Sequence, residues 1–295
     1  MLRPLSLSSL APVPSPASVP APARVSFRAF APRLVMTALA ATFLVANAAP
    51  ALAQSAEEKG KAIAVAADQR DTGWVDSRAS LKMILGTQNG QQRAVRELDS
   101  KALERTPGTD GDKSLIVFRA PKDVQNTALL TYNHVTGNDD QWIYLPALKR
   151  VKRIASANRS GPFMGSEFAY EDFAAAEIEK FTYKWLKDEP CGQKTCHVIE
   201  RVPTYSNSGY SRQVVWMDQP DLRVVRVDYY DKRGKLLKTL TSNQWQQYGG
   251  KFWRAHDMNM VNHQTGKTTR LTWGPFQLKT GLSANDFTET SLARQ

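Results

Sequence analysis

Residues 142–172 read WIYLPALKRVKRIASANRSGPFMGSEFAYED, and the change of pattern within this stretch decides the fold. Its first residues follow a strand pattern, because successive side chains of a strand point to opposite faces. Trp142 and Tyr144 therefore share one face, and Ile143 lies on the other. Apolar residues on both faces predict that both faces of this strand are covered.

The second half of the stretch interrupts the strand pattern. Residues 155–180 are rich in small residues and contain two glycines and one proline. A helix is expected over Tyr170–Ile178, because Glu171 and Asp172 suit the positive end of a helix dipole. The connection of 26 residues is long for a hairpin loop. Long ordered connections of this kind tend to be lids or binding loops.

A period of two runs through the rest of the chain from about residue 79. Short runs rich in Val, Ile, Leu, Tyr, Trp and Thr alternate with Gly, Asn and Asp turn signals roughly every 8–14 residues. This pattern predicts a mainly β, antiparallel meander, and the long crossovers of a parallel sheet are absent. One helix is expected before it, over residues 55–70, where acidic residues precede good helix formers.

The N-terminal segment has the features of an export signal. An arginine-containing flank without acids precedes the apolar run Leu34–Ala49, which is followed by Pro50 and the small-residue end Ala51-Leu52-Ala53. This pattern predicts a cleaved signal peptide over residues 1–53 and a periplasmic mature chain. The alternative is a membrane anchor, but the apolar run is shorter than the roughly 20 residues that a spanning helix needs.

The mature chain, residues 54–295, is expected to form a single domain, since an all-β fold of this length can share one core. The leader contains four arginines and no acid, so its removal lowers the formal charge from +11 to +7. Positive charge spread along the chain suits anionic partners such as lipid headgroups. No dense basic tract or nucleic-acid motif occurs, so we expect no nucleic acid to bind.

The two cysteines, Cys191 and Cys196, enclose four residues in the sequence CGQKTC. An even pair in an exported chain predicts a disulfide, here at the tip of a hairpin. The spacing differs from the C-x-x-C of redox motifs, and no second cysteine pair is present to complete a metal site.

Motifs for catalysis are absent from the sequence. It contains four histidines without a metal-ligand spacing, and it has no nucleophile elbow, phosphate-binding loop or dinucleotide fingerprint. We therefore expect a binding protein without cofactor or metal, not an enzyme. One alternative stays open, because active sites built from scattered residues leave no linear trace. In that alternative Glu171 and Asp172 serve as the acid and base of an envelope hydrolase.

The stretch 142–172 resembles the hallmark block of the LolA-like outer-membrane lipoprotein-sorting proteins. Members often read W-[IVL]-Y-L-P-x-L-x-[KR]-V-[KR]-R-I, then a bend, then F-M-G-[ST]-[DE]-F-[ST]-Y-E-D. The matching positions here are Trp142, Tyr144, Leu145, Pro146, Lys149, Arg150, Val151, Arg153, Ile154, Phe163, Met164, Gly165, Ser166, Phe168, Tyr170, Glu171 and Asp172. Pro162 and Ala169 depart from the usual pattern. With the export signal and the meander, the resemblance covers most of residues 54–295.

The resemblance implies a twisted antiparallel β-barrel that is not closed, with helices covering its open mouth. Its interior would accept the acyl chains of lipids or lipoproteins during transfer between the inner and outer membranes, with an inner-membrane lipid permease as partner. The implied ligand-binding residues of the lid and mouth are Trp142, Tyr144, Phe163, Met164, Phe168 and Tyr170. The implied contacts to headgroups or partners are Lys149, Arg150 and Arg153.

Two readings compete with this assignment. The same fold could serve a periplasmic sensor that binds a signalling protein. The aromatic residues of the stretch could also be ordinary core, and its basic run a solvated edge.

Overall fold

The computed structural model describes residues 54–106 and 108–294, so the expected signal peptide over residues 1–53 lies outside the described residues. Two α-helices are present in the described part, α1 (Ala56–Arg70) and the short α2 (Glu289–Leu292). The strands are β1 (Asp76–Thr87), β2 (Gln92–Leu103), β3 (Lys113–Ala120), β4 (Ala128–Tyr132), β5 (Asp140–Leu145), β6 (Arg150–Arg153), β7 (Phe181–Cys191), β8 (Lys194–Pro203), β9 (Arg212–Asp218), β10 (Val224–Tyr230), β11 (Leu236–Tyr248), β12 (Phe252–Asn262), β13 (Lys267–Trp273) and β14 (Gln277–Leu278). Six 3-10 turns join them, η1 (Pro146–Leu148), η2 (Ser156–Asn158), η3 (Phe163–Gly165), η4 (Tyr170–Phe173), η5 (Ile178–Lys180) and η6 (Ala284–Phe287).

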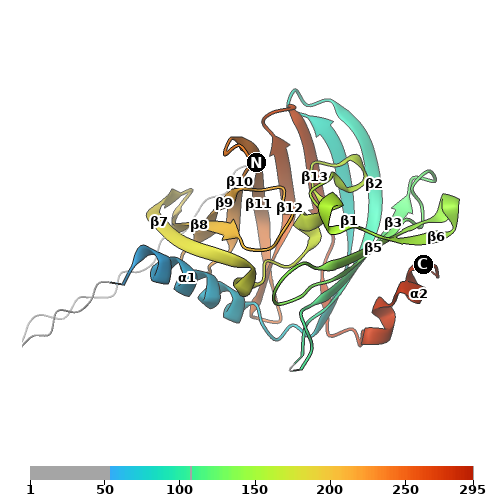
Figure 1. Cartoon of the computed structure of the whole chain (residues 1–295), viewed down its shortest axis with the longest axis horizontal. Helices are drawn as coiled ribbons and strands as arrows, with labels where there is room; N and C mark the ends of the chain where they lie inside the picture. Colours follow the sequence, from blue (N-terminus) through green and yellow to red (C-terminus); the bar gives the residue numbers. More distant parts are fainter. Residues whose placement is uncertain (1–53, 107, 295) are drawn as a thin grey trace, which may run out of the picture. The chain divides into compact units, whose positions relative to one another are not determined.

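The strands form one sheet of 14 strands in the order β6-β5-β4-β3-β2-β1-β13-β12-β11-β10-β9-β8-β7, with β14 paired to β1. Every neighbouring pair is antiparallel. The sheet is strongly curved and is not closed into a barrel (Figure 1). The expected fold class, a mainly β and unclosed antiparallel sheet, is confirmed.

The order of the strands explains where the long connection runs. The chain builds one half of the sheet outward from β1 to the edge strand β6, and the other half inward from the edge strand β7 to β13. Residues 155–180, which we call the plug, join these two edges. Because its ends start at opposite edges of a curved sheet, the plug has to cross the sheet (Figure 1).

One face of the sheet, called the inner face here, packs against the plug and α1. The buried core on this side takes residues from both halves, including Leu98, Phe118, Val227, Leu240 and Met260. A fully buried side chain of this size contributes roughly 1.5–3 kcal/mol through its removal from water. The core on the inner face therefore joins the two halves of the sheet.

The helix α1 has a start that the sequence encodes. The Ser55 hydroxyl accepts a hydrogen bond from the Glu58 backbone N–H at 3.1 Å, and the Glu58 carboxylate accepts one from the Ser55 N–H at 3.0 Å. This reciprocal pair is a capping box. At Gly60 a Cβ atom would lie 2.5 Å from the backbone nitrogen of Trp185, so only glycine allows α1 to approach β7 this closely. The prediction of a helix over residues 55–70 is confirmed.

A second core lies on the outer face of β3, β4 and β5. The segment of residues 282–292, called the C-terminal segment here, buries Leu282, Phe287 and Leu292 against this face. Trp142 and Tyr144 belong to this outer core, whereas Gln141 on the same strand contacts the plug. Both faces of β5 are therefore covered, as the alternation of its residues predicts.

The helix expected over Tyr170–Ile178 is wrong. The structure has only the 3-10 turns η4 and η5 there, with extended residues between them. The reason is that Glu171 is buried and its carboxylate accepts hydrogen bonds from a distant loop, which anchors the chain before a second turn can form. In the described part of the chain, no helix has the length and apolar character needed to cross a membrane.

Candidate functional site

The plug fills the inner face of the sheet with aromatic side chains. Phe163 is completely buried and lies 5.6 Å from Phe118 of β3, measured between ring centroids. Within the plug it contacts Tyr170 at 5.4 Å and Phe173 at 4.7 Å in edge-on geometry. Phe168 is also buried, 5.7 Å from Phe173. Edge-on and tilted pairs at these distances are favourable beyond the area that they bury.

The backbone of the plug shares no strand pairing with the sheet, although side chains of the sheet such as Arg96, Thr269 and Lys238 bond to it. Phe163 N–H donates to the Phe168 carbonyl at 2.7 Å, and Tyr170 N–H donates to the Gly161 carbonyl at 3.1 Å. Between residues 156 and 179 of the described chain, every backbone-to-backbone hydrogen bond stays within the plug. Met164 and Gly165 have φ angles of 50° and 74°, a left-handed bend that is unusual for methionine. The plug is thus a separate folded loop, attached to the sheet by side chains.

The first attachment is a buried ion pair. Lys238 of β11 donates to the Asp172 carboxylate at 2.6 Å and to the Glu167 carbonyl at 2.9 Å. The side chains of Lys238 and Asp172 are only 4% and 3% exposed. Tyr210 donates its hydroxyl to the same carboxylate at 2.7 Å, and burial raises the pKa of Tyr210 well above its ordinary value. Asp172 therefore holds the middle of the plug to β11 and to the loop between β8 and β9.

The second attachment centres on Glu171. Its carboxylate accepts hydrogen bonds from the Gly209 N–H at 2.7 Å, the Ser208 hydroxyl at 2.9 Å and the Tyr205 hydroxyl at 3.1 Å. Burial, together with the adjacent Asp172 carboxylate, raises the pKa of the Glu171 carboxyl above its ordinary value. A Cβ at Gly209 would lie 2.9 Å from the Glu171 Oε1 atom, so a larger residue there would displace this contact.

The third attachment joins both ends of the plug to the loop before β5. Asp139 pairs with Lys180 and, at 2.6 Å, with Arg159. All three side chains are almost completely buried. The Nε atom of Arg159 has no hydrogen-bond partner in the described part of the chain. Two cations and one carboxylate thus lie together under the plug, an arrangement that is costly to keep out of water.

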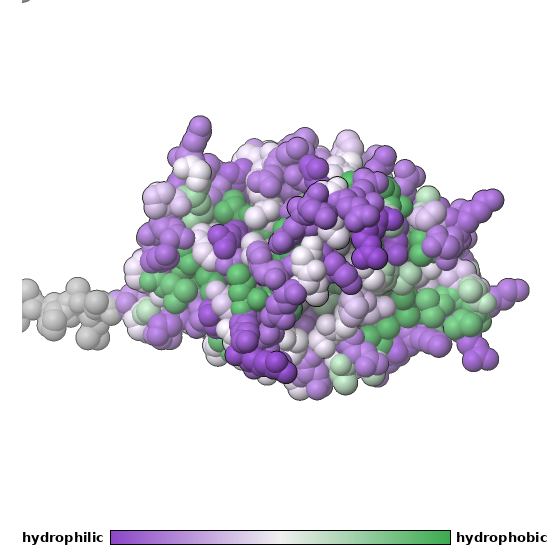
Figure 2. All heavy atoms as spheres, turned by 90° about the horizontal axis from the view of Figure 1, so that it is seen from above, coloured by the Kyte–Doolittle hydropathy of each residue, from purple (hydrophilic) through white to green (hydrophobic). Residues whose placement is uncertain are grey.

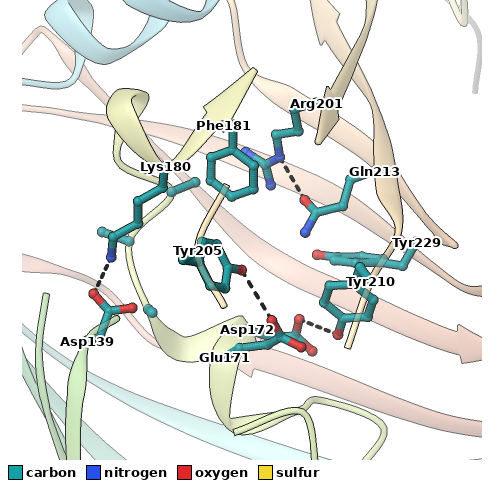
Figure 3. A pocket seen from close by; sticks show the side chains of 13 residues that line it. Asp139, Glu171, Asp172, Lys180, Phe181, Arg201, Tyr205, Tyr210, Gln213 and Tyr229 are labelled. Carbon is teal, nitrogen blue, oxygen red and sulfur yellow. Dashed lines mark hydrogen bonds and ion pairs between the residues drawn. The ribbon is translucent and has the colours of Figure 1, made fainter. Parts of the chain in front are cut away.

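A small cavity of about 60 Å³ lies between these attachments (Figure 3). Polar and aromatic side chains line it together, with Glu171, Asp172 and Lys180 facing Tyr205, Tyr210 and Tyr229 (Figure 3). Typical ligand pockets measure roughly 300–1,000 Å³. The space is suited to a few water molecules and is too small for an acyl chain while the plug is in place.

The predicted lid residues Phe163, Met164, Phe168 and Tyr170 lie together in the plug and pack on the inner core. Trp142 and Tyr144 were predicted to line the same mouth, but they lie on the outer face against the C-terminal segment. The six predicted residues therefore fall into two groups on opposite faces of the sheet, and not into one mouth. The alternation of β5 is as expected, but a single strand does not indicate which face of the sheet turns inward.

The predicted headgroup contacts lie at the edge of the sheet. Arg150 and Arg153 are exposed on the edge strand β6, and Lys149 is exposed in the left-handed turn before it. Arg153 pairs with Asp140 of β5. These residues are therefore separate from the plug and face solvent.

Cys191 and Cys196 form a disulfide at the end of the β7–β8 hairpin. Within the described ranges, no group of three or more His, Cys, Asp or Glu side chains has an arrangement that could hold a metal ion.

The sequence interpretation missed the residues that attach the plug from outside, chiefly Lys238, Tyr210 and Asp139. A signal for Lys238 was present. The period of two puts it on the same face as Leu240, which is an inward position, and a lysine there is unexpected unless it is paired.

Comparisons with known proteins agree with this fold. A family model described as an uncharacterized protein matches residues 110–294. An outer membrane lipoprotein-sorting protein domain from Vibrio parahaemolyticus is 51% identical, with a TM-score of 0.77, over 81% of this chain and 100% of that chain. A DUF1329 family protein from Desulfovibrio piger is 30% identical, with a TM-score of 0.75, over 81% of this chain and 99% of that chain.

A LolA superfamily protein from Nitrosomonas europaea shares the fold, with a TM-score of 0.61 at 18% identity over 79% of this chain and 98% of that chain. No curated protein sequence matches this chain.

Proposed function

Since the chain belongs to the LolA-like family that includes the lipoprotein-sorting domain from Vibrio parahaemolyticus and the DUF1329 protein from Desulfovibrio piger, we propose that it is a periplasmic carrier of acyl chains. Its cargo is the apolar part of a lipid or lipoprotein, and its ligand surface is the inner face of the sheet under the plug. The protein acts by binding and release and not by catalysis.

One observation carries the proposal: the plug covers an apolar surface but shares no strand pairing with it. The sheet beneath contributes Phe118, Leu240, Met260 and other buried apolar residues. A loop that shares no strand pairing with the sheet can leave this surface without breaking the sheet. The apolar surface that it uncovers is then available to another apolar group.

The energetics of the exchange are balanced. Moving the plug removes aromatic contacts from the inner face, which is unfavourable in water. The same movement returns buried charges such as Asp139 and Lys238 to water, which recovers the free energy spent on burying them. An acyl chain that takes the vacated surface contributes about 0.8 kcal/mol for each CH₂ group that it buries. Cargo can thus replace the plug at a small net cost.

The proposal also assigns a route and a partner. Cargo passes across the periplasm between the inner and outer membranes, and an inner-membrane lipid permease supplies or accepts it. We assign the exposed basic edge formed by Lys149, Arg150 and Arg153 to contacts with headgroups or with this partner. Its support is the exposure of these three cations and the resemblance of residues 142–172 to the family block.

The test is direct binding. Protein purified from the periplasm is analysed by native mass spectrometry and lipid extraction, and delipidated protein is then titrated with a fluorescent fatty acid. The wild type should retain acyl chains and take up the probe. The Lys238→Met variant, which loses a plug attachment, should take up the probe at least tenfold faster.

Arg223→Met is the matched control, because Arg223 also pairs with a buried carboxylate, that of Asp218, but makes no ion pair or ring contact with a residue of the plug. Its uptake rate should equal that of the wild type. A wild-type protein that carries no lipid, combined with no uptake by any variant, would refute the proposal.

A further inference from the structure

A second, larger cavity lies where the plug meets the turn between β1 and β2. Its volume is about 360 Å³. Leu85 and Gly86 of β1, Ala94 of β2 and Thr268 of β13 form its walls, and Gly165 of the plug closes one side. Figure 2 views the molecule from above relative to Figure 1, and on this face hydrophilic residues predominate over smaller hydrophobic patches.

The charges that line this cavity are strongly unbalanced. Arg93 and Arg96 of β2 and Lys267 of β13 contribute three positive charges, and Glu167 contributes the one negative charge, which leaves an excess of two. The Glu167 carboxylate already accepts a hydrogen bond from Asn262 at 2.7 Å. Among the described residues, none of the three cations has a carboxylate within 4.0 Å.

The outer face of the same strands shows the contrast. There Lys82 of β1 lies 3.7 Å from Glu97 of β2, and Arg119 of β3 lies 2.7 Å from Asp99 of β2. Lys82 and Arg119 on the outer face are paired with acids, whereas the three cations in the cavity are not. Concentrated positive charge in a concave site with low-dielectric walls attracts an anion.

Arg96 is the deepest of the three cations. Its guanidinium lies 5.7 Å from the ring of Phe118 and donates one hydrogen bond, to the Met164 carbonyl at 2.5 Å. A guanidinium has five N–H donors in a planar fork that matches the oxygens of phosphate and carboxylate groups. The Arg96 side chain is half-buried, and this burial lowers its pKa from the ordinary value. The remaining N–H donors of Arg96 are therefore available to a ligand at a position beside the apolar core.

We propose that this cavity binds the anionic group of the cargo, a phosphate or a carboxylate, through Arg93, Arg96 and Lys267. The inference rests on the proposed function and adds the class of cargo and its orientation. The acyl chain lies on the apolar inner face beside Phe118, and the charged head lies at the β1–β2 end. A neutral lipid of equal chain length lacks this second contact.

The test compares three ligands at one pH: dodecyl phosphate, dodecanol and inorganic phosphate, all below the concentration at which the lipids aggregate. Affinities for delipidated protein are measured by calorimetry. The wild type should bind dodecyl phosphate at least tenfold more tightly than dodecanol.

The test variant is Arg93→Gln/Lys267→Gln, because both side chains are exposed and neither attaches the plug. It should lose the preference for the phosphate and keep the affinity for dodecanol. The control is Lys82→Gln/Arg119→Gln on the outer face, which should keep the preference.

The outcomes separate the two proposals. Equal affinity of the wild type for dodecyl phosphate and dodecanol overturns the anion site and leaves the carrier function standing. No binding of either lipid overturns the carrier function itself. Tight binding of inorganic phosphate that the test variant loses, without binding of dodecyl phosphate, identifies a site for the free anion and overturns the assignment to cargo.

Discussion

The sheet carries two covers, the plug of 26 residues and the C-terminal segment of 11 residues, that are held in different ways. The plug crosses the inner face, where it packs through Phe163 and Phe168, and it is attached in addition by buried charges, chiefly Lys238 with Asp172 and Lys180 with Asp139. The C-terminal segment lies on the outer face and is attached by Leu282, Phe287 and Leu292. The difference teaches which cover can move. A charged side chain that leaves the protein interior regains favourable hydration. An apolar side chain that leaves it is exposed to water, which is unfavourable.

The two covers can be compared by truncating one buried phenylalanine in each. Phe287→Ala should lower the free energy of unfolding by about 3–5 kcal/mol, the usual range for a buried phenylalanine. Phe163→Ala removes an equally buried ring. The loss of stability should be clearly smaller for Phe163→Ala. If the plug detaches before the sheet unfolds, a change within the plug cannot lower the free energy of unfolding by more than the plug's own local stability. Urea denaturation monitored by circular dichroism measures both values, and equal losses would break the comparison.

The covers should also respond differently to pH. Burial, with the nearby Asp112 carboxylate, raises the pKa of Glu177 in the plug to about 7. The folded protein therefore favours protonated Glu177. The contribution of this carboxyl to the free energy of unfolding is fully present below about pH 4.5 and is lost as the pH rises to 7. For this shift the loss is at most about 3 kcal/mol, and it is limited by the local stability of the plug. In the C-terminal segment, a hydrogen bond from the Ser283 backbone lowers the pKa of Asp286, so its contribution to stability is present at neutral pH and is lost as the pH falls below about 3.8.

Glu177→Gln should flatten the stability profile between pH 4.5 and 7 and exceed the wild type in stability at pH 8. Urea midpoints measured across this range test the expectation. Asp286→Asn serves as the control and should keep the slope. An unchanged slope in Glu177→Gln would show that plug attachment does not depend on this carboxyl.

The smallest expected effect compares two tyrosine hydroxyls. Tyr210 donates to the Asp172 carboxylate in the plug, and Tyr132 donates to the Phe287 carbonyl in the C-terminal segment. A hydrogen bond to a charged group contributes about 1.5–3 kcal/mol, and a neutral one about 0.5–1.5 kcal/mol. Tyr210→Phe should therefore speed amide exchange in the plug alone, whereas Tyr132→Phe should leave plug exchange unchanged. Exchange that rises equally in both covers would contradict their independence.

Much of the fold could be predicted from local patterns. Ser55 and Glu58 mark the start of α1, and the alternation around Trp142 predicts a strand covered on both faces. That residues 155–180 form a long connection and not a hairpin loop could be predicted from their length and their many small residues. These features depend on residues that are close in sequence, so the sequence alone is enough to predict them.

The parts that could not be predicted depend on partners distant in sequence. Glu171 binds a loop 38 residues away at Gly209, and this contact ends the helix that its sequence favours. Asp139 and Lys180 resemble ordinary surface charges, because each follows or precedes a turn, and only the path of the plug buries them. The cavity beside Arg96 likewise needs three strands and the plug to exist.

The pairing of β1 with β13 has a consequence for how the chain folds. Leu81 pairs with Trp273 across the centre of the sheet, so the two meanders can each form early but stay unjoined until the last strands are available. Contacts of such high sequence separation slow folding, because a long loop must close before they form. The pairing of β1 with β13 is then the last part of the sheet to assemble. A chain that crossed a membrane from its N-terminus would lack this pairing until nearly all of its residues had emerged.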